Sequence, residues 1–226
     1  MNADKITLPD TDTVILINQK GIRVSQESLF LMRFVDSLNL KIGSACVPGC
    51  GSGLLAIGLA ALNSESHITG IELQKDLADK AIDNVLLNNF EGRITIRTGD
   101  IRDQHVERPD QKFDLVVMNP PFRKLKTGKM SPDLTRRYSN HEHHGTLEDF
   151  IRAASILLKH KGVVALVMLP ERLGELLHYM EKRNISAYLI QAVHHTPTSA
   201  ANAVLIAGRK GCRSPLTILP AYLAKP

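Results

Sequence analysis

Apolar runs of strand length alternate with amphipathic stretches of helix length along most of this 226-residue chain. The strands expected from this pattern are residues 14–17, 44–47, 67–71, 94–97, 113–118, 163–168, 187–193 and 203–207. The expected helices are residues 26–38, 54–62, 75–87, 147–158 and 171–182. Because strands that alternate with helices form βαβ units, the sequence predicts an open α/β sheet of seven strands after residue 40. The sheet is expected to be mostly parallel, with an antiparallel C-terminal edge strand from the two adjacent final strands.

The length and composition fit one globular domain, since hydrophobic residues make up 43% of the chain. We expect residues 1–226 to form a single domain, with residues 1–40 as an N-terminal extension and residues 41–226 as the core. No apolar run is long enough to span a membrane, and the three cysteines form no disulfide framework, so we expect a cytoplasmic protein. The net charge of +5 is compatible with a nucleic-acid partner but does not require one.

A glycine-rich segment with the sequence GCGSG, from Gly49 to Gly53, separates an expected strand from an expected helix. Glycines at such a junction let the backbone approach a ligand closely and direct N–H groups toward it. Glu72 ends the next strand, where an acidic side chain accepts hydrogen bonds from ribose hydroxyls. A tight turn and a surface carboxylate are the simpler interpretation, but the two features together favour a nucleoside cofactor.

Asp100 and Ile101 follow the third strand of the predicted core. Ligands of open α/β sheets bind at the carboxyl ends of the strands. We therefore expect Asp100 to accept a hydrogen bond from an adenine amino group and Ile101 to offer its backbone N–H to the ring. The alternative is that Asp100 caps the turn that follows.

The most specific motif is the tetrapeptide Asn119-Pro120-Pro121-Phe122, which follows the expected strand 113–118. Two consecutive prolines fix the backbone, so the side-chain carbonyl of Asn119 and the main-chain carbonyl of Pro120 can converge on one NH2 group. Such an amino group is a poor nucleophile when its lone pair is delocalised into a ring or a carbonyl. Two acceptors orient both hydrogens and stabilise the positive charge that develops on the nitrogen, while Phe122 can stack on a planar acceptor. The motif predicts chemistry at such a nitrogen, and a plain Pro-Pro turn is the alternative.

In this order, and over nearly the whole chain, these motifs resemble the class I S-adenosylmethionine (SAM)-dependent methyltransferases. Members with the (D/N/S)PP(Y/F) motif modify amino nitrogens of adenine, guanine, cytosine or glutamine. The chain is more closely similar to the bacterial tRNA adenine-N6 methyltransferases that act beside the anticodon of a valine tRNA, through residues 20–27, 136–142, 147–149 and 197–210. The resemblance implies a Rossmann-like fold, an RNA partner, and SAM bound by Gly49, Gly51, Gly53, Glu72, Asp100, Ile101 and Asn119.

The position two residues before the first glycine departs from this pattern. Methyltransferases of this fold usually carry an acidic residue there, whereas this chain has Val47, followed by Pro48. The departure leaves two alternatives, which are weak cofactor binding and compensation by another acid such as Glu27.

Basic residues crowd the polar segment after the tetrapeptide. We expect Arg123, Lys124, Arg136 and Arg137 to contact the phosphates of an RNA substrate, because this segment must border the acceptor pocket. A solvated loop without a ligand is the alternative.

Two other groups of reactive side chains are given no chemical role. His141, His143 and His144 do not have the spacing of a structural zinc site, so no metal is expected. Methyl transfer from SAM is direct, so Cys50 is expected to be a small packing residue and not a nucleophile.

The features together predict a SAM-dependent N-methyltransferase that acts on N6 of an adenine in RNA, most simply in the anticodon loop of a tRNA. A base in such a loop is already unpaired, which makes its insertion into a pocket inexpensive. Two alternatives stay open. The same motif could methylate N2 of a ribosomal RNA guanine or a protein glutamine, and a chain with Val47 and Pro48 could bind SAM or RNA without catalysis.

Overall fold

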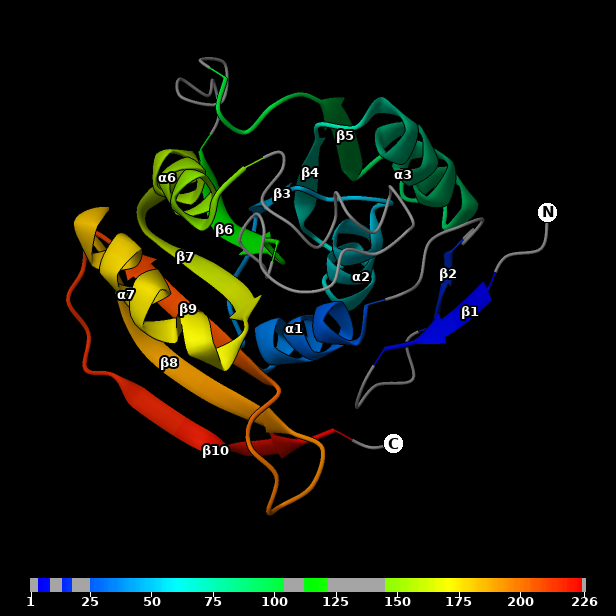
Figure 1. The fold of residues 1–226 in the computed structure, drawn as a ribbon. Coiled ribbons are helices and arrows are strands. Elements are labelled where there is room, and N and C mark those ends of the chain that lie inside the picture. The colour runs from blue at the N-terminus through cyan, green and yellow to red at the C-terminus, as the bar shows by residue number, and fades with distance from the viewer. Residues whose placement is uncertain (1–3, 9–13, 18–24, 104–111, 122–144, 225–226) are drawn as a thin grey trace.

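A computed structural model of the chain describes residues 4–8, 14–17, 25–103, 112–121 and 145–224 (Figure 1). Its strands are β1 (Asp4–Thr7), β2 (Val14–Ile17), β3 (Ser44–Pro48), β4 (His67–Glu72), β5 (Ile94–Thr98), β6 (Phe113–Met118), β7 (Leu158–Met168), β8 (Ile185–His194), β9 (Ala203–Lys210) and β10 (Thr217–Leu223). Its helices are α1 (Gln26–Ser37), α2 (Leu54–Leu62), α3 (Lys75–Leu87), α6 (Leu147–Leu157), the 3-10 helix η1 (Pro170–Arg172) and α7 (Leu173–Lys182).

The main sheet contains eight strands in the order β10-β8-β9-β7-β6-β3-β4-β5, and β1 and β2 form a separate two-stranded sheet. Strand β9 pairs antiparallel with β7 and with β8, and every other neighbouring pair in the main sheet is parallel. The predicted α/β class with a mostly parallel sheet is therefore confirmed.

Two details of the sheet differ from the sequence prediction. The sheet has eight strands instead of seven, because β10 adds to the C-terminal end. Strand β10 is mostly exposed and contains Pro220, so it lacks the apolar pattern of a core strand, and an edge strand tolerates a proline that cannot donate. The antiparallel strand β9 also lies inside this end of the sheet, since the chain turns back after β8 and enters between β7 and β8.

Two hydrophobic cores lie on the two faces of the sheet. Side chains of successive strand residues point to opposite faces, so Leu115 and Val117 join the core beneath α1 and α2, while Val116 and Met118 join the core beneath α6 and α7. Figure 1 shows these two pairs of helices on either side of the sheet. The same alternation runs through β7 and β9. Helices on both faces bury the central strands completely and fix the positions of their carboxyl ends.

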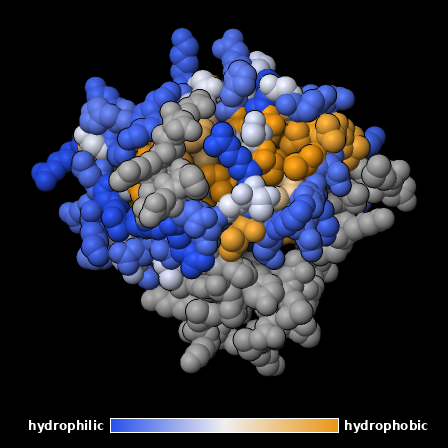
Figure 2. All heavy atoms as spheres, turned by 90° about the horizontal axis from the view of Figure 1, so that it is seen from above, coloured by the Kyte–Doolittle hydropathy of each residue, from blue (hydrophilic) through white to orange (hydrophobic). Residues whose placement is uncertain are grey.

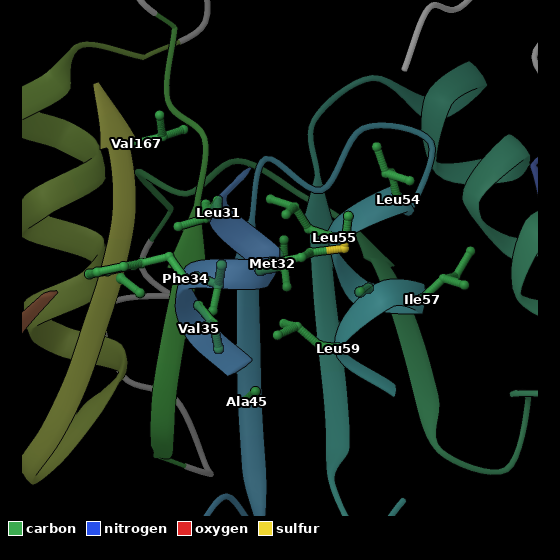
Figure 3. Packing of buried hydrophobic residues seen from close by; sticks show 14 of the residues in the cluster. Leu31, Met32, Phe34, Val35, Ala45, Leu54, Leu55, Ile57, Leu59 and Val167 are labelled. Atoms are coloured by element: carbon green, nitrogen blue, oxygen red, sulfur yellow. The ribbon is translucent and has the colours of Figure 1, made fainter. Parts of the chain in front are cut away.

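Helix α1 crosses α2 closely at Gly58. Figure 3 shows Met32 of α1 pointing toward α2 among the buried residues of this core. A Cβ atom built on Gly58 would lie 1.8 Å from the Met32 Sδ atom, and Met32 is 0% exposed. A glycine at this position is therefore what allows the two helices to approach.

Replacing Gly58 with alanine should lower the free energy of unfolding by about 1–3 kcal/mol, because the added methyl group overpacks the contact with Met32. Gly58→Ala should lower the free energy of unfolding much less in a Met32→Ala background, because the shorter side chain leaves space for the added methyl group. Urea unfolding of the wild type, the two single variants and the double variant measures this coupling. Equal costs of Gly58→Ala in both backgrounds would show that the close approach of the helices does not limit packing.

The β1–β2 sheet is fastened to α3 through Asn88. The Asn88 side chain accepts a hydrogen bond from the backbone N of Leu16 at 2.9 Å and donates one to the Leu16 carbonyl oxygen at 2.7 Å.

Figure 2 shows the molecule from above, where hydrophobic residues gather within a border of hydrophilic ones. Within the described part of the chain, no helix has the length and apolar character needed to cross a membrane.

Candidate active site

The predicted site residues follow the carboxyl ends of four neighbouring strands, β6, β3, β4 and β5. The glycine segment follows β3, Glu72 ends β4, Asp100 follows β5 and Asn119 follows β6. Strand β3 pairs with β4 on one side and with β6 on the other, so the strand order reverses next to β3. Open α/β sheets bind ligands at such a switch point, and the fold brings these residues to it.

All three glycines of the segment adopt left-handed backbone conformations, with φ of 66° at Gly49, 56° at Gly51 and 89° at Gly53. Side chains other than glycine rarely accept these angles. A Cβ atom built on Gly51 has no neighbour within 4 Å, so the backbone there borders open space. Gly53 precedes α2, whose N-terminus has no side-chain cap, and the first N–H groups of a helix have no acceptor within it. These features suit close contact with a polar ligand.

The Glu72 carboxylate is buried and connects two loops of the site. Its two oxygens accept hydrogen bonds from the backbone N of Gly51 at 2.8 Å and of Gln74 at 2.9 Å. Only 5% of Glu72 is exposed. Each oxygen keeps further acceptor capacity, so the carboxylate can hold the glycine segment and still accept from ligand hydroxyls.

Asp100 is paired with a residue that the sequence analysis did not single out. Its Oδ1 atom accepts hydrogen bonds from the backbone N and the side-chain Nε of Arg102, each at 2.9 Å. The Arg102 side chain is 44% exposed, so it can leave the carboxylate without disturbing the core. Ile101 is buried in the core beneath α6. Contact of Asp100 with an adenine ring would require Arg102 to move aside.

Asn119 has its side chain fixed at one end and unpaired at the other. Its Nδ2 atom lies 3.1 Å from Oγ of Ser28, in the first turn of α1, and 3.4 Å from Oγ of Ser25, the N-cap of that helix. Its Oδ1 atom is the one buried side-chain oxygen without a hydrogen-bond partner in the described part of the chain. A buried acceptor left unpaired costs about 1–3 kcal/mol, so a native structure keeps one where it serves a purpose. The Oδ1 atom is available to a donor from a ligand.

The prolines of the tetrapeptide are held from the other side of the site. The buried guanidinium of Arg172, in η1, donates from Nη1 to the Pro121 carbonyl at 3.4 Å and pairs with Glu175 at 3.2 Å. Sequence reasoning missed Ser28 and Arg172, because both reach the tetrapeptide only through tertiary packing. Pro120 is buried between the two held residues.

A buried valine occupies the position, two residues before Gly49, where methyltransferases of this fold usually carry an acid. Val47 is 0% exposed and belongs to the core beneath α1 and α2, so no charged side chain stands there. Glu27, which we named as a compensating acid, accepts a hydrogen bond from Ser25 Oγ at 2.6 Å. Because Ser25 also contacts Asn119, the acid belongs to the same hydrogen-bonded group as the tetrapeptide.

Several predicted residues lie outside the described part of the chain. They are Phe122, the expected RNA-contacting residues Arg123, Lys124, Arg136 and Arg137, and the histidines His141, His143 and His144. In the described ranges, no group of three or more potential ligands is placed to hold a metal ion.

Cys46 and Cys50 are buried beside the site, and their thiols are held in the neutral form. Burial raises the pKa of Cys46 to about 12. Burial, followed by the negative charge of Glu72, also raises the pKa of Cys50. A thiol must ionise to react, so both should be inert in the folded protein.

At pH 8, a thiol reagent such as DTNB should modify Cys212, which is partly exposed, and leave Cys46 and Cys50 unmodified. All three should react after unfolding in guanidinium chloride. Mass spectrometry of the labelled peptides identifies the modified residue. Rapid labelling of Cys50 in the folded protein would reopen the possibility of a nucleophilic role.

The sequence of this chain is similar to a family model and to several known proteins. A family model described as methyltransferase small domain matches residues 23–182. A tRNA1(Val) (adenine(37)-N6)-methyltransferase from Porphyromonas gingivalis is 34% identical over 159 residues, which are 70% of this chain and 62% of that protein. A protein of the same name from Escherichia coli O157:H7 is 34% identical over 128 residues, which are 56% of this chain and 50% of that protein. The chain thus spans 62% and 50% of the lengths of these two curated relatives.

Solved structures share the fold. A predicted O-methyltransferase from Agrobacterium tumefaciens aligns with a TM-score of 0.68 and 23% identity, over 85% of this chain and 86% of that one. TrmN from Thermus thermophilus aligns with a TM-score of 0.57 and 22% identity, over 81% of this chain and 48% of that one. Both likenesses concern the arrangement of the sheet and its helices.

Proposed function

The chain belongs to the methyltransferase small domain family, and from that premise we propose that it methylates N6 of an adenine in tRNA, with SAM as the methyl donor. The observation that carries the proposal is the unpaired, buried Oδ1 atom of Asn119 in the Asn-Pro-Pro motif at the end of β6. An adenine N6 amino group has two hydrogens to donate, and it satisfies this acceptor. The names of the relatives support adenine and tRNA as the substrate.

The residues around the glycine segment fit SAM by their chemistry. The Gly51 backbone borders open space, so a ligand can approach it closely. The Glu72 carboxylate at the tip of β4 retains acceptor capacity for the two ribose hydroxyls. Asp100 and Ile101, at the end of β5, are the proposed contacts of the adenine part of the cofactor. When bound, SAM supplies an electrophilic methyl group.

The tetrapeptide orients the acceptor nitrogen for attack on that methyl group. The Asn119 Oδ1 atom and the Pro120 carbonyl each accept one N–H of the amino group. This arrangement takes the nitrogen lone pair out of conjugation with the base and aligns it with the methyl group. Both acceptors would also stabilise the positive charge that grows on the nitrogen as it takes the methyl group, whose bond to the SAM sulfur would break and leave S-adenosylhomocysteine. The methylated nitrogen is acidic and loses a proton to water, so no side chain has to serve as a strong base.

A base in the anticodon loop of a tRNA suits this site, because it is unpaired and can be splayed into a pocket at low cost. Phe122 is proposed to stack on the base. Arg123, Lys124, Arg136 and Arg137 are proposed to contact the neighbouring phosphates. We also propose a cytoplasmic location, because the proposed substrate is a tRNA.

Nucleoside analysis of RNA tests the proposed activity. Total RNA from cells with and without the gene should differ in N6-methyladenosine in the tRNA fraction, measured by liquid chromatography and mass spectrometry. A difference in N2-methylguanosine of ribosomal RNA would show that the substrate is a ribosomal RNA guanine, methylated by the same Asn-Pro-Pro chemistry. If RNA methylation is unchanged and glutamine methylation of a protein is altered, the substrate is a protein glutamine and not an RNA base.

Replacing Arg136 and Arg137 with alanine should raise the KM for RNA and make binding less dependent on salt. Each lost phosphate contact removes about 0.7 from the slope of log K against log salt for a single strand, so we expect a change of about 1 to 2. SAM affinity should stay near that of the wild type. Filter binding at several salt concentrations measures the slope, and an unaltered slope would show that the two arginines do not contact phosphates.

A further inference from the structure

Ser25, Glu27 and Ser28 form a hydrogen-bonded group with the side-chain amide of Asn119. Ser25 Oγ donates its one proton to Glu27 Oε2 at 2.6 Å. The same oxygen accepts the backbone N–H of Ser28 at 3.3 Å and faces Asn119 Nδ2 at 3.4 Å. Because its proton is used, Ser25 can only accept from Asn119. The amide nitrogen must therefore point to Ser25, which turns Oδ1 away from it.

Ser28 lies at hydrogen-bond distance from the same amide nitrogen. Its Oγ atom lies 3.1 Å from Asn119 Nδ2, so the two amide hydrogens have one hydroxyl acceptor each. A flipped amide would place Oδ1 against Ser25 with no proton between the two oxygens. It would also aim the NH2 group of Asn119 at the substrate amino group, a contact between two donors.

We propose that Ser25, Ser28 and Glu27 are positioning residues, which hold the Asn119 amide with Oδ1 toward the substrate amino group. This inference rests on the proposed N-methyl transfer. Glu27 acts by fixing the proton of Ser25, and the two serines act by accepting from Asn119 Nδ2. Helix α1 keeps the three residues in place, since Ser25 caps its N-terminus and Ser28 is buried against the sheet.

The kinetic test separates positioning from folding. Ser28→Ala and Glu27→Ala should each lower kcat by about tenfold, the effect of one lost hydrogen bond, with KM and SAM affinity within about twofold. Glu27→Gln should recover most of the loss caused by Glu27→Ala, because its amide oxygen still accepts from Ser25. Ser37→Ala is the matched control and should match the wild type, because the Ser37 hydroxyl is on the same helix but donates to the Phe34 carbonyl.

A double-variant cycle shows whether Ser28 acts through Asn119. In an Asn119→Ala background, Ser28→Ala should cause no further loss of single-turnover rate. An equal loss in both backgrounds would overturn the inference, since it would mean that Ser28 supports the fold or the substrate and not the amide.

Nuclear magnetic resonance tests the orientation without any substrate, so its outcome stands apart from the methyltransferase proposal. In the ¹⁵N-labelled full chain, the Asn119 side-chain NH2 signals are assigned by their loss in Asn119→Asp. Both protons should exchange with water at least about tenfold more slowly than those of the exposed Asn202, and Ser28→Ala should accelerate them. Exchange as fast as that of Asn202 in the wild type would overturn the inference even if RNA is methylated. Slow exchange without RNA methylation would overturn only the proposed activity.

Discussion

Replacing Asn119 with alanine is expected to lower kcat by on the order of 10²-fold or more, comparable to the loss of one preorganised partner of a developing charge. The Oδ1 atom is unpaired in the free protein, so its hydrogen bond to the amino group forms with substrate and strengthens as the nitrogen gains charge. The loss should therefore appear in kcat more than in KM.

The cofactor should still bind to Asn119→Ala, because the glycine segment and Glu72 are untouched. Asn119→Asp keeps an acceptor oxygen toward the substrate but places its second oxygen against Ser25, so its activity should fall between those of Asn119→Ala and the wild type. Calorimetry with SAM and single-turnover methyl transfer measure the two effects separately. If Asn119→Ala transfers methyl groups at the wild-type rate, the tetrapeptide is only a turn.

Replacing Glu72 with alanine is expected to weaken SAM binding by about 1.5–3 kcal/mol, the range for losing a hydrogen bond to a charged acceptor. The substitution removes the proposed ribose acceptor, and it also releases the backbone N of Gly51, which bonds to Glu72 at 2.8 Å. Titration calorimetry with SAM gives the affinity directly.

Two variants sharpen this measurement. Glu65→Ala removes an exposed carboxylate just before the start of β4, at the opposite end of the strand, and should leave SAM affinity unchanged. Glu72→Gln keeps one acceptor oxygen and should fall between Glu72→Ala and the wild type. Wild-type affinity in Glu72→Ala would rule out the ribose contact and leave the carboxylate with only its role in holding the loop.

The sequence predicted the central elements closely, because local signals and burial agree there. The bounds of α2 and α3 are those expected, and α1 begins at the expected residue, with Ser25 as its N-cap. Strands β3 and β6 were recognisable as short apolar runs, since a parallel strand buried on both faces needs apolar side chains throughout. Strand β10 was missed because it is an exposed edge, where that requirement disappears.

The partners of the site residues could not be predicted from the sequence. Asn119 is held by Ser28, 91 positions away, and Pro121 by Arg172, 51 positions away. Such contacts depend on how α1 and η1 pack at the end of the sheet, and no local pattern encodes them. The positions of Glu72 and Asn119 at the ends of strands were nevertheless enough to predict that both belong to one site, because parallel strands bring their carboxyl ends to one edge of the sheet.

Transfer of a labelled methyl group from SAM to unmodified valine tRNA is the most direct test of the proposed function. In a single-turnover assay with the full chain in excess, we predict that the label enters the RNA and is recovered as N6-methyladenosine by mass spectrometry. Asn119→Ala should still bind SAM and yield the product about 10²-fold more slowly. SAM binding without methyl transfer to any RNA by the wild-type protein would contradict the account.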